Sequence, residues 1–275
     1  MATLQSAEAP FAAPRPVKIV ARRRENHDTV SIDIDDGMAV EPGQFNMLYA
    51  FGKGEVPISV SARGHGRITH TTRNVGLVTA ALTSAAPGTM IGLRGPFGHG
   101  WPVAGLRGKD VVVVAGGLGL APLRPALHAL FENRTEYGRL VLLYGARTPS
   151  DLLFTRELEK WRGRFDVEVL VTVDVASSGW RGEVGVVTRL FSRLAIDRDH
   201  AAALVCGPEV MMRFAASGLL DVGIDADSIW LSMERNMQCG AGICGHCQVG
   251  SFLICRDGPV LPFSKLAPIF KVKEL

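Results

Sequence analysis

The residues best suited to chemistry are four cysteines near the end of the chain. They follow the pattern C-x4-C-x2-C, with the last one eight positions after the third, at Cys239, Cys244, Cys247 and Cys255. This is the plant-type spacing by which four thiolates hold a 2Fe–2S cluster. Glycines stand between the first three, where a backbone can turn tightly and direct its N–H groups toward sulfur. Such a cluster moves single electrons and does no bond chemistry alone, so the sequence predicts part of an electron path.

Zinc is the main alternative at these cysteines. Structural zinc ions also bind four thiolates, but usually from two C-x2–4-C pairs that a longer loop separates. A Rieske centre needs a second histidine motif, which the sequence lacks, so His246 is expected beside the metal site and not among its ligands. Disulfides are not expected, because no signal-peptide-like stretch is present and 275 residues can bury a core without cross-links. A 2Fe–2S cluster therefore leads, and zinc stays open.

Composition argues against nucleic-acid and membrane partners. The net charge is only +3, and the basic residues form no run longer than residues 22–24, which is too weak a charge for nucleic-acid binding. The most apolar window, residues 111–130, contains charged side chains, prolines and glycines, so it does not suit a membrane span. We therefore expect a cytoplasmic location.

Two patterns divide the chain. Over residues 17–93 apolar positions alternate in short stretches between turn signals, which predicts an antiparallel β-barrel. After Trp101, apolar runs such as residues 111–114 alternate with helical segments, among them residues 155–161, 188–194 and 209–220. This alternation predicts an α/β domain with a parallel sheet. The expected parts are a flexible N-terminus, the barrel, the α/β domain and a cluster segment, at residues 1–14, 15–103, 104–228 and 229–275. The apolar end, residues 262–275, is expected to finish the core or to form a docking surface.

A glycine-rich loop follows the first predicted strand of the α/β domain. It reads Ala-Gly-Gly-Leu-Gly-Leu-Ala-Pro, and its expected nucleotide contacts are Gly116, Gly117, Gly119 and Pro122. Two glycines one residue apart let the backbone approach a pyrophosphate at a helix N-terminus, where free N–H groups attract anions. Pro122 stands where G-x-G-x-x-G would have its third glycine, and it suits the first turn of a helix. Taken alone, the loop also fits an ordinary strand-to-helix turn.

Several short motifs carry a resemblance that covers nearly the whole chain. They are Pro-Gly-Gln-Phe at 42–45, Gly-Pro-Phe-Gly at 95–98, the glycine loop, Tyr-Gly-Ala-Arg at 144–147 and Cys-Gly-Pro at 206–208. With them the chain resembles the ferredoxin–NADP reductase superfamily, in which a flavin-binding barrel precedes a nicotinamide-binding domain. The cysteine segment is similar to that of the electron-transfer subunit of dihydroorotate dehydrogenase. The stretch Ser-Met-Glu-Arg-Asn-Met and the short interval before Cys255 resemble most the gamma subunits of cytoplasmic NiFe hydrogenases (sulfhydrogenases) and the related subunit of anaerobic sulfite reductase.

The resemblance implies FAD on the barrel. The superfamily's Arg-x-Tyr-Ser motif falls on residues 56–59, where the serine matches but valine and isoleucine replace the arginine and the tyrosine. The flavin contacts carried over are Val56, Pro57, Ile58, Ser59, Thr71, Thr72, Arg73, Gly76 and Thr79. Arg73 is the expected substitute for the missing phosphate-binding cation. Gly76 and Thr79 are expected at a helix N-terminus that faces the pyrophosphate. Val56 and Ile58 otherwise suit the core of a strand.

For the nicotinamide nucleotide, an arginine stands near the place where NAD-binding domains usually carry an acidic residue. Arg147 can pair with a 2′-phosphate, which favours NADP(H) over NAD(H). Superfamily members with similar loops, however, use either NADP(H) or NAD(H). The resemblance places Cys206 and Gly207 near the nicotinamide ring and makes Cys206 the catalytic candidate. A small buried residue at the sheet edge is the alternative for this cysteine.

Together these carriers imply a converter between two-electron and one-electron transfer. A nicotinamide gives a hydride, a cluster takes one electron, and a flavin can serve both. We expect a diaphorase, an FAD- and 2Fe–2S-containing NAD(P)H oxidoreductase subunit, whose partners are the catalytic and electron-relay subunits of a NiFe hydrogenase complex. One alternative is a reductase subunit for a dihydroorotate dehydrogenase, a sulfite reductase or another flavoprotein. Outside enzymes, the alternative is a zinc- or cluster-stabilised redox-sensing interaction module.

Overall fold

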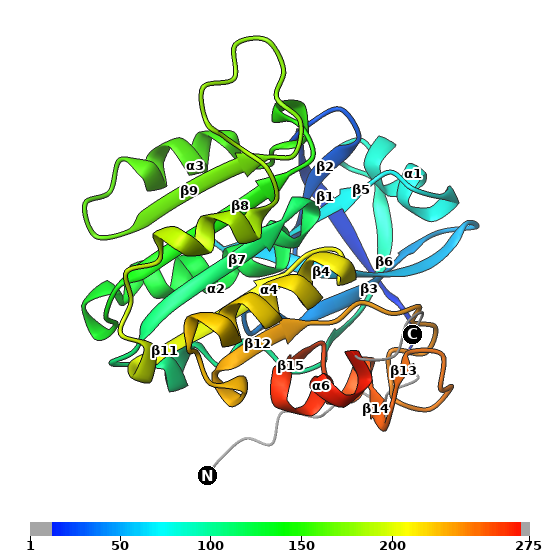
Figure 1. The fold of residues 1–275 in the computed structure, drawn as a ribbon. Helices are drawn as coiled ribbons and strands as arrows, with labels where there is room; N and C mark the ends of the chain where they lie inside the picture. The colour runs from blue at the N-terminus through cyan, green and yellow to red at the C-terminus, as the bar shows by residue number, and fades with distance from the viewer. Residues whose placement is uncertain (1–12, 271–275) are drawn as a thin grey trace.

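The computed structural model describes residues 13–270, which form a barrel, a wide sheet and a cysteine-rich segment that contacts both (Figure 1). This confirms the expected fold class. Residues 1–12, most of the expected flexible N-terminus, and residues 271–275 lie outside the described part. No helix among residues 13–270 has the length and apolar character that a membrane span requires. The cytoplasmic location stays a prediction.

The barrel closes because six antiparallel strands pair in the order β1-β2-β5-β4-β3-β6. Alternate side chains point inward, so Val30, Ile32 and Ile68 fill its apolar core. The strands are β1 (Arg15–Arg24), β2 (Thr29–Asp35), β3 (Phe45–Ala50), β4 (Gly54–Gly64), β5 (Arg67–Arg73) and β6 (Met90–Phe97). The helix α1 (Leu77–Ser84) follows β5 and packs on the barrel.

The second sheet has seven strands in the order β10-β9-β8-β7-β11-β12-β15. They are β7 (Asp110–Gly116), β8 (Leu140–Ala146), β9 (Glu168–Val173), β10 (Glu183–Val184), β11 (Ala201–Cys206), β12 (Ile229–Ser232) and β15 (Val260–Pro262). All pairs are parallel except the last, where β15 returns antiparallel beside β12. Strands β7 and β11 are continuous apolar runs because helices cover both faces of the sheet.

One face of this sheet packs on α2 (Leu120–Glu132) and α3 (Thr155–Arg162), and the other on α4 (Glu209–Val222) (Figure 1). Arg124, buried in α2, connects the sheet layer to the barrel. Its Nε donates to Glu157 in α3 at 2.6 Å, and its Nη1 donates to the carbonyl of Ser61 in β4 at 3.0 Å. A charged side chain with partners on two sides fixes the barrel against α2 and α3.

The cysteine segment leaves the sheet and returns to a neighbouring position. Ser232 in β12 pairs with Val260 in β15, so residues 233–259 form an excursion between two adjacent strands. It contains the hairpin β13 (Gln248–Val249) and β14 (Phe252–Leu253) and the short helix α5 (Ile254–Asp257). The helix α6 (Phe263–Phe270) follows and buries two apolar side chains in the core, at Phe263 and Leu266. The described part of the apolar end therefore packs as core.

Several short elements differ from the expectations. Residues 188–194, expected as an ordinary helix, form a 3-10 segment at Val187–Arg193. Strands β12 and β15 were not expected, because elements of three or four residues are too short to show a periodic pattern. Domain boundaries at residues 103 and 228 stay predictions, and two strands from beyond residue 228 complete the sheet.

Candidate cofactor-binding site

The cysteine loop directs backbone N–H groups at its own sulfurs. The amide of Gly242 donates to Cys255 Sγ at 3.1 Å, and the amide of Ala241 donates to Cys239 Sγ at 3.3 Å. Gly240 and Gly242 have φ values of 70° and 74°, a conformation that strongly favours glycine. Donors of this kind stabilise thiolates, the form in which cysteine binds iron. The loop therefore fits the group that its cysteine spacing predicts.

The four predicted ligands are arranged as two pairs. The Cys244 thiol lies close enough to Cys239 to affect its pKa, and the Cys247 thiol lies close enough to Cys255 to affect the pKa of that thiol. Among residues 13–270, no three His, Cys, Asp or Glu side chains are grouped as ligands of one metal ion. Each iron of a 2Fe–2S cluster takes two of the four thiolates, whereas a zinc ion takes all four. Two neighbouring pairs match the division of ligands in a 2Fe–2S cluster.

One edge of this loop is open to solvent. Cys244 is exposed and Ile243 beside it is 58% exposed, whereas Cys247 and Cys255 are buried. Backbone hydrogen bonds, the strongest with His246, lower the pKa of the Cys244 thiol to about 7. Burial, followed by the neighbouring Cys247 thiol, raises the pKa of Cys255 to about 12. Electrons that leave through this loop have their shortest way out at Cys244.

The opposite side of the loop packs on the barrel. A side chain added to Gly240 would meet the ring of Phe97 at 3.1 Å and Met47 at 3.3 Å. Arg94 in β6 donates from Nη1 to the carbonyl of Cys239 at 2.9 Å. The cysteine loop is thereby held against strands β3 and β6.

The predicted flavin segment lies two strands from this contact. Pro57 in β4 pairs with Met47 in β3, and Met47 pairs with Arg94 in β6. Neighbouring strands are about 4.8 Å apart, so this row spans about 10 Å. The barrel thus brings the segment expected to hold FAD close to the loop expected to hold the cluster.

His70 supports the flavin segment from inside the barrel. Its Nδ1 lies 3.1 Å from the carbonyl oxygens of both Ile58 and Ser59, and the side chain is fully buried. Burial lowers the pKa of His70 to about 4, so the ring is neutral and donates from Nδ1. His70 could not be identified from the sequence, because a histidine between two threonines in a strand gives no functional signal.

The other predicted flavin contacts on β4 and β5 differ in what surrounds them, which is apolar for some residues and polar for others. Val56 and Ile58 are partly buried and pack against the apolar core of the barrel, and their contact with a flavin stays a prediction. Thr71 shares hydrogen bonds with Ser31 and Ser61 at 2.8 and 2.7 Å. The buried hydroxyl of Thr72 has no hydrogen-bond partner among the described residues. A buried orphan hydroxyl beside the predicted site can serve a polar ligand atom.

The helix N-terminus at Gly76 is partly capped by the protein itself. The Thr79 hydroxyl accepts from the amides of Val75 and Gly76 at 3.0 and 2.9 Å. These donors are therefore engaged without a ligand, and the contact of Thr79 with a pyrophosphate stays a prediction.

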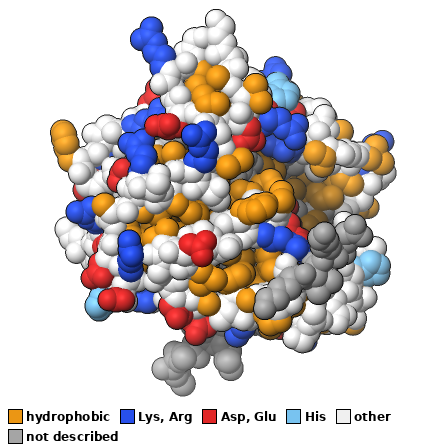
Figure 2. Space-filling model, viewed as in Figure 1, with side chains coloured by type: hydrophobic (Ala, Val, Ile, Leu, Met, Phe, Trp, Pro, Cys, Tyr) orange, Lys and Arg blue, Asp and Glu red, His pale blue; other side chains and the backbone are white. Residues whose placement is uncertain are grey.

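A cleft of about 770 Å³ opens at the carboxyl ends of β7, β8 and β11, the edge at which α/β sheets bind ligands. Its lining includes these predicted residues: Arg73, Gly116, Gly117 and Arg147. Apolar side chains gather on the face that carries α4 (Figure 2), where Val210 and Phe214 line the cleft and are 62% and 67% exposed. Exposed apolar side chains beside a glycine loop suit the flat rings of a nucleotide.

The glycine loop requires its glycines for packing as well as for access. A side chain on Gly119 would begin 2.3 Å from the carbonyl oxygen of Cys206. Gly117 has a φ of 53°, and its missing side chain would begin 3.9 Å from Nη2 of Arg73. Pro122 lies in the first turn of α2, as expected. The loop therefore exposes bare backbone to the cleft while it packs tightly on β11.

Cys206 ends β11 but does not line the cleft, whose lining continues at Pro208. Burial, followed by the negative charge of Glu234, raises the pKa of the Cys206 thiol, so it stays protonated. A side chain on Gly207 would meet Met211 at 2.2 Å, which explains the glycine there. The catalytic role of Cys206 stays a prediction.

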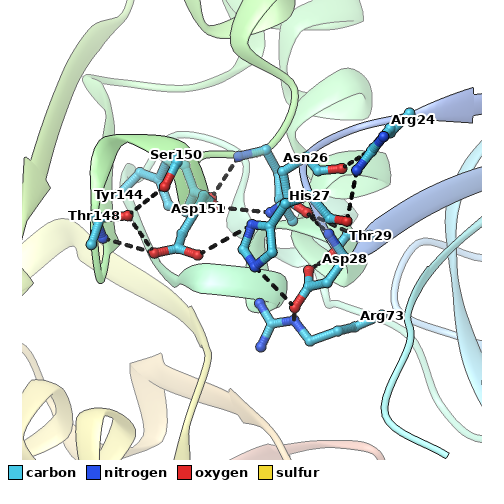
Figure 3. A network of polar contacts seen from close by, with 11 residues as sticks. Arg24, Asn26, His27, Asp28, Thr29, Arg73, Tyr144, Thr148, Ser150 and Asp151 are labelled. Atoms are coloured by element: carbon cyan, nitrogen blue, oxygen red, sulfur yellow. Dashed lines mark hydrogen bonds and ion pairs between the residues drawn. The ribbon is translucent and has the colours of Figure 1, made fainter.

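Polar contacts join the barrel to the sheet at the mouth of the cleft (Figure 3). The His27 ring lies between two carboxylates, 3.7 Å from Asp28 and 3.9 Å from Asp151. Arg73 lies 3.5 Å from Asp28, and the Asn26 side chain donates to the carbonyl of Asp151 at 3.3 Å. This network has no signal in the sequence, because it forms between a barrel turn and a loop more than a hundred residues away.

Arg147 stands beside an acidic residue that the sequence analysis also missed. The amide of Asp174 donates to the carbonyl of Ala146 at 2.9 Å, which continues the ladder of β8 and β9 past their ends. Asp174 and Arg147 are both exposed and both line the cleft. A carboxylate accepts a hydrogen bond from a ribose 2′-hydroxyl and repels a 2′-phosphate, whereas an arginine attracts the phosphate.

Two family models match consecutive parts of the chain. The oxidoreductase NAD-binding domain matches residues 113–217, and the iron-sulfur cluster binding domain of dihydroorotate dehydrogenase B matches residues 234–267. The second match contains all four cysteines of the loop.

Relatives match over most of their length. Sulfhydrogenase 2 subunit gamma of Pyrococcus furiosus is 36% identical over 248 residues, which cover 84% of this chain and 86% of that protein. A probable dihydroorotate dehydrogenase B (NAD(+)) electron transfer subunit of the same organism is 33% identical over 233 residues. These cover 85% of this chain and 84% of that protein. A chain from a structure of NADH-dependent reduced ferredoxin–NADP oxidoreductase, studied for flavin-based electron bifurcation, aligns with a TM-score of 0.75 and 26% identity over 94% of both chains.

Proposed function

Because this chain belongs to the family of electron-transfer subunits that includes sulfhydrogenase gamma and dihydroorotate dehydrogenase B electron-transfer subunits, we propose that it passes electrons between NAD(P)(H), FAD and a 2Fe–2S cluster. It is an oxidoreductase subunit with an NAD-binding domain and an iron–sulfur domain. The observation that carries the proposal is the row of paired residues from Pro57 through Met47 to Arg94, which links the flavin segment to the carbonyl of Cys239.

The residues of the chain serve this task by holding and orienting. Bound FAD would supply the exchange between electron pairs from the nicotinamide and single electrons for the cluster. The glycine loop and the ends of β8 and β9 would hold the nucleotide in the cleft. Residues 56–59 and Arg73 would hold the flavin, with His70 fixing the carbonyls of Ile58 and Ser59. Two pairs of cysteines, at Cys239, Cys244, Cys247 and Cys255, would hold the irons.

An anaerobic visible spectrum tests the electron path. We expect flavin and iron–sulfur absorption that bleaches when NADH or NADPH is added, because all three carriers lie on one chain. A colourless protein that contains zinc would overturn the cluster, and flavin absorption alone would overturn the exit through the cysteines.

As partner we propose a NiFe hydrogenase complex, and a dihydroorotate dehydrogenase is the second candidate. The similarity to a sulfhydrogenase subunit and to a dihydroorotate dehydrogenase subunit supports both, and the short interval between Cys247 and Cys255 favours the first. The exposed edge at Ile243 and Cys244 is the expected contact.

Purification of the tagged chain from its own cells, followed by identification of the bound subunits, tests this partner. Hydrogenase subunits should copurify, and Ile243→Asp should lose them while NAD(P)H-driven dye reduction stays unchanged. Copurification of a dihydroorotate dehydrogenase instead would decide for the second candidate.

A further inference from the structure

Arg94 makes three hydrogen bonds, one to the cysteine loop and two to Glu55 in the barrel strand β4. Its Nη1 donates to the carbonyl of Cys239 at 2.9 Å, its Nε donates to Glu55 Oε1 at 2.8 Å, and its Nη2 donates to the second carboxylate oxygen. The side chains of Arg94 and Glu55 are only 11% and 17% exposed. A planar guanidinium held by both oxygens of one carboxylate has little freedom to turn.

The pair presents its positive end to the cysteines. Glu55 occupies two nitrogens of the guanidinium, which leaves Nη1 for the residue that carries the first thiol. The guanidinium also lies 5.7 Å from the ring centre of Phe97, the ring on which Gly240 packs. Solvent screens a charge in this setting far less than a charge on the surface.

We propose that Arg94 is a positioning residue for the cluster, which anchors Cys239 and raises the reduction potential of the cluster, and that Glu55 limits this rise. The inference rests on the proposed function, because it takes the four cysteines as ligands of a 2Fe–2S cluster. Reduction adds one negative charge to a cluster. A nearby cation stabilises the reduced form and a nearby carboxylate destabilises it.

This proposal predicts shifts of opposite sign for the two members of one pair. Arg94→Met leaves the Glu55 carboxylate beside the loop, so the midpoint potential of the cluster should fall. Glu55→Gln leaves the guanidinium without its counter-charge, so the potential should rise. A pair that only supports the fold would move the potential in one direction, or not at all, whichever member is removed.

The midpoint potential is measured by anaerobic titration of the purified full-length protein with dithionite. The electron paramagnetic resonance signal of the reduced cluster is recorded at each potential. Arg94→Lys keeps the positive charge but loses the paired hydrogen bonds to the Glu55 carboxylate. The midpoint potential of the cluster in this variant should stay near that of the unchanged protein. Its iron should be lost faster to a chelator, because the anchor at Cys239 is weaker. Arg23→Met removes a similar arginine–carboxylate contact, with Asp33, on β1 and should alter neither property.

Failure of the inference can be told from failure of the proposed function. If the unchanged protein shows no cluster signal, the proposed function fails. If the cluster is present but Glu55→Gln lowers its potential or leaves it unchanged, the role of Arg94 is overturned. This holds even where Arg94→Met fails to load iron, because Glu55→Gln keeps the arginine and its bond to Cys239.

Discussion

His70 is a titratable residue that the barrel keeps neutral. Its Nδ1 is shared between the carbonyls of Ile58 and Ser59, while its Nε2 has no hydrogen-bond partner among the described residues. A proton on that second nitrogen would place an unpaired charge in the apolar interior. The residue that supports the flavin segment is therefore also a source of acid sensitivity.

We predict that the free energy of unfolding falls as the pH drops below 6.5. The folded pKa of His70 is about 4, against an ordinary value of 6.5, so the unfolded chain takes up a proton that the folded ring refuses. Between these values the loss approaches ~1.4 kcal/mol for each pH unit, and above 6.5 it vanishes. Urea denaturation between pH 7 and pH 5 measures the slope. His70→Gln should remove it, and an equal slope in both proteins would contradict the assignment.

Asp174 changes the expected choice of nucleotide. The sequence alone leaned toward NADP(H) through Arg147, but the structure places an exposed carboxylate on the adjacent strand end. We predict that the protein prefers NADH, and that Asp174→Ser raises kcat/KM for NADPH about tenfold, ~1.4 kcal/mol, by removing repulsion of the 2′-phosphate. Steady-state dye reduction with both nucleotides measures this. Arg147→Ala should lower only the NADPH rate, and a fall in the NADH rate instead would argue against this geometry.

At the scale of elements, the turn from β7 to α2 has no room for a side chain at Gly119. At Gly119 the nearest atom to an added side chain is a backbone carbonyl, which cannot move without shifting the end of β11. We predict that Gly119→Ala costs about 2 kcal/mol of stability and weakens nucleotide binding at least tenfold. Denaturation and nucleotide titration measure the two effects. Gly105→Ala, where an added side chain meets nothing within 4 Å, is the matched control and should change neither.

Much of this element layout could be predicted from the sequence, for physical reasons that also explain the failures. Buried strands such as β7 and β11 show as apolar runs, and the cysteine spacing shows directly which thiols belong together. The pairing of Glu55 with Arg94 had no sequence signal, because the two residues are 39 positions apart and meet only when β4 and β6 pair on either side of β3. The same holds for Asp174, whose importance depends on strand order. Contacts between elements were thus the part that sequence patterns could not supply.

At the scale of the whole molecule, Arg124 sets the position of the barrel relative to the sheet. Burial alone would raise the pKa of Glu157, but its hydrogen bonds with Arg124 and the neighbouring His128 ring, 3.7 Å away, lower it to about 2. The pair therefore stabilises the fold fully above pH 4.5, the ordinary value, and loses that contribution as the pH falls toward 2.

We predict that Arg124→Met lowers the free energy of unfolding at neutral pH by about 2 kcal/mol, allowing for the partial exposure of Glu157. It should also slow flavin reduction by the nucleotide, because the cleft lies between the parts that Arg124 joins. Urea denaturation and stopped-flow absorbance measure the two effects. Arg156→Met, an exposed position on the neighbouring helix α3, should leave both unchanged.

The return of β15 beside β12 has a consequence for engineering. Because Ser232 and Val260 are paired, the whole cysteine excursion begins and ends at one place on the sheet edge. A tight turn between these two strands would close the same edge, but the deletion would also remove buried core side chains such as Val249 and Ile254. If the proposed function holds and the core is repaired, such a shortened chain should keep the nicotinamide and flavin sites and lose its outlet for single electrons. A different one-electron carrier domain can be inserted between β12 and β15. The electron acceptor would then change while the nicotinamide-binding domain stays the same.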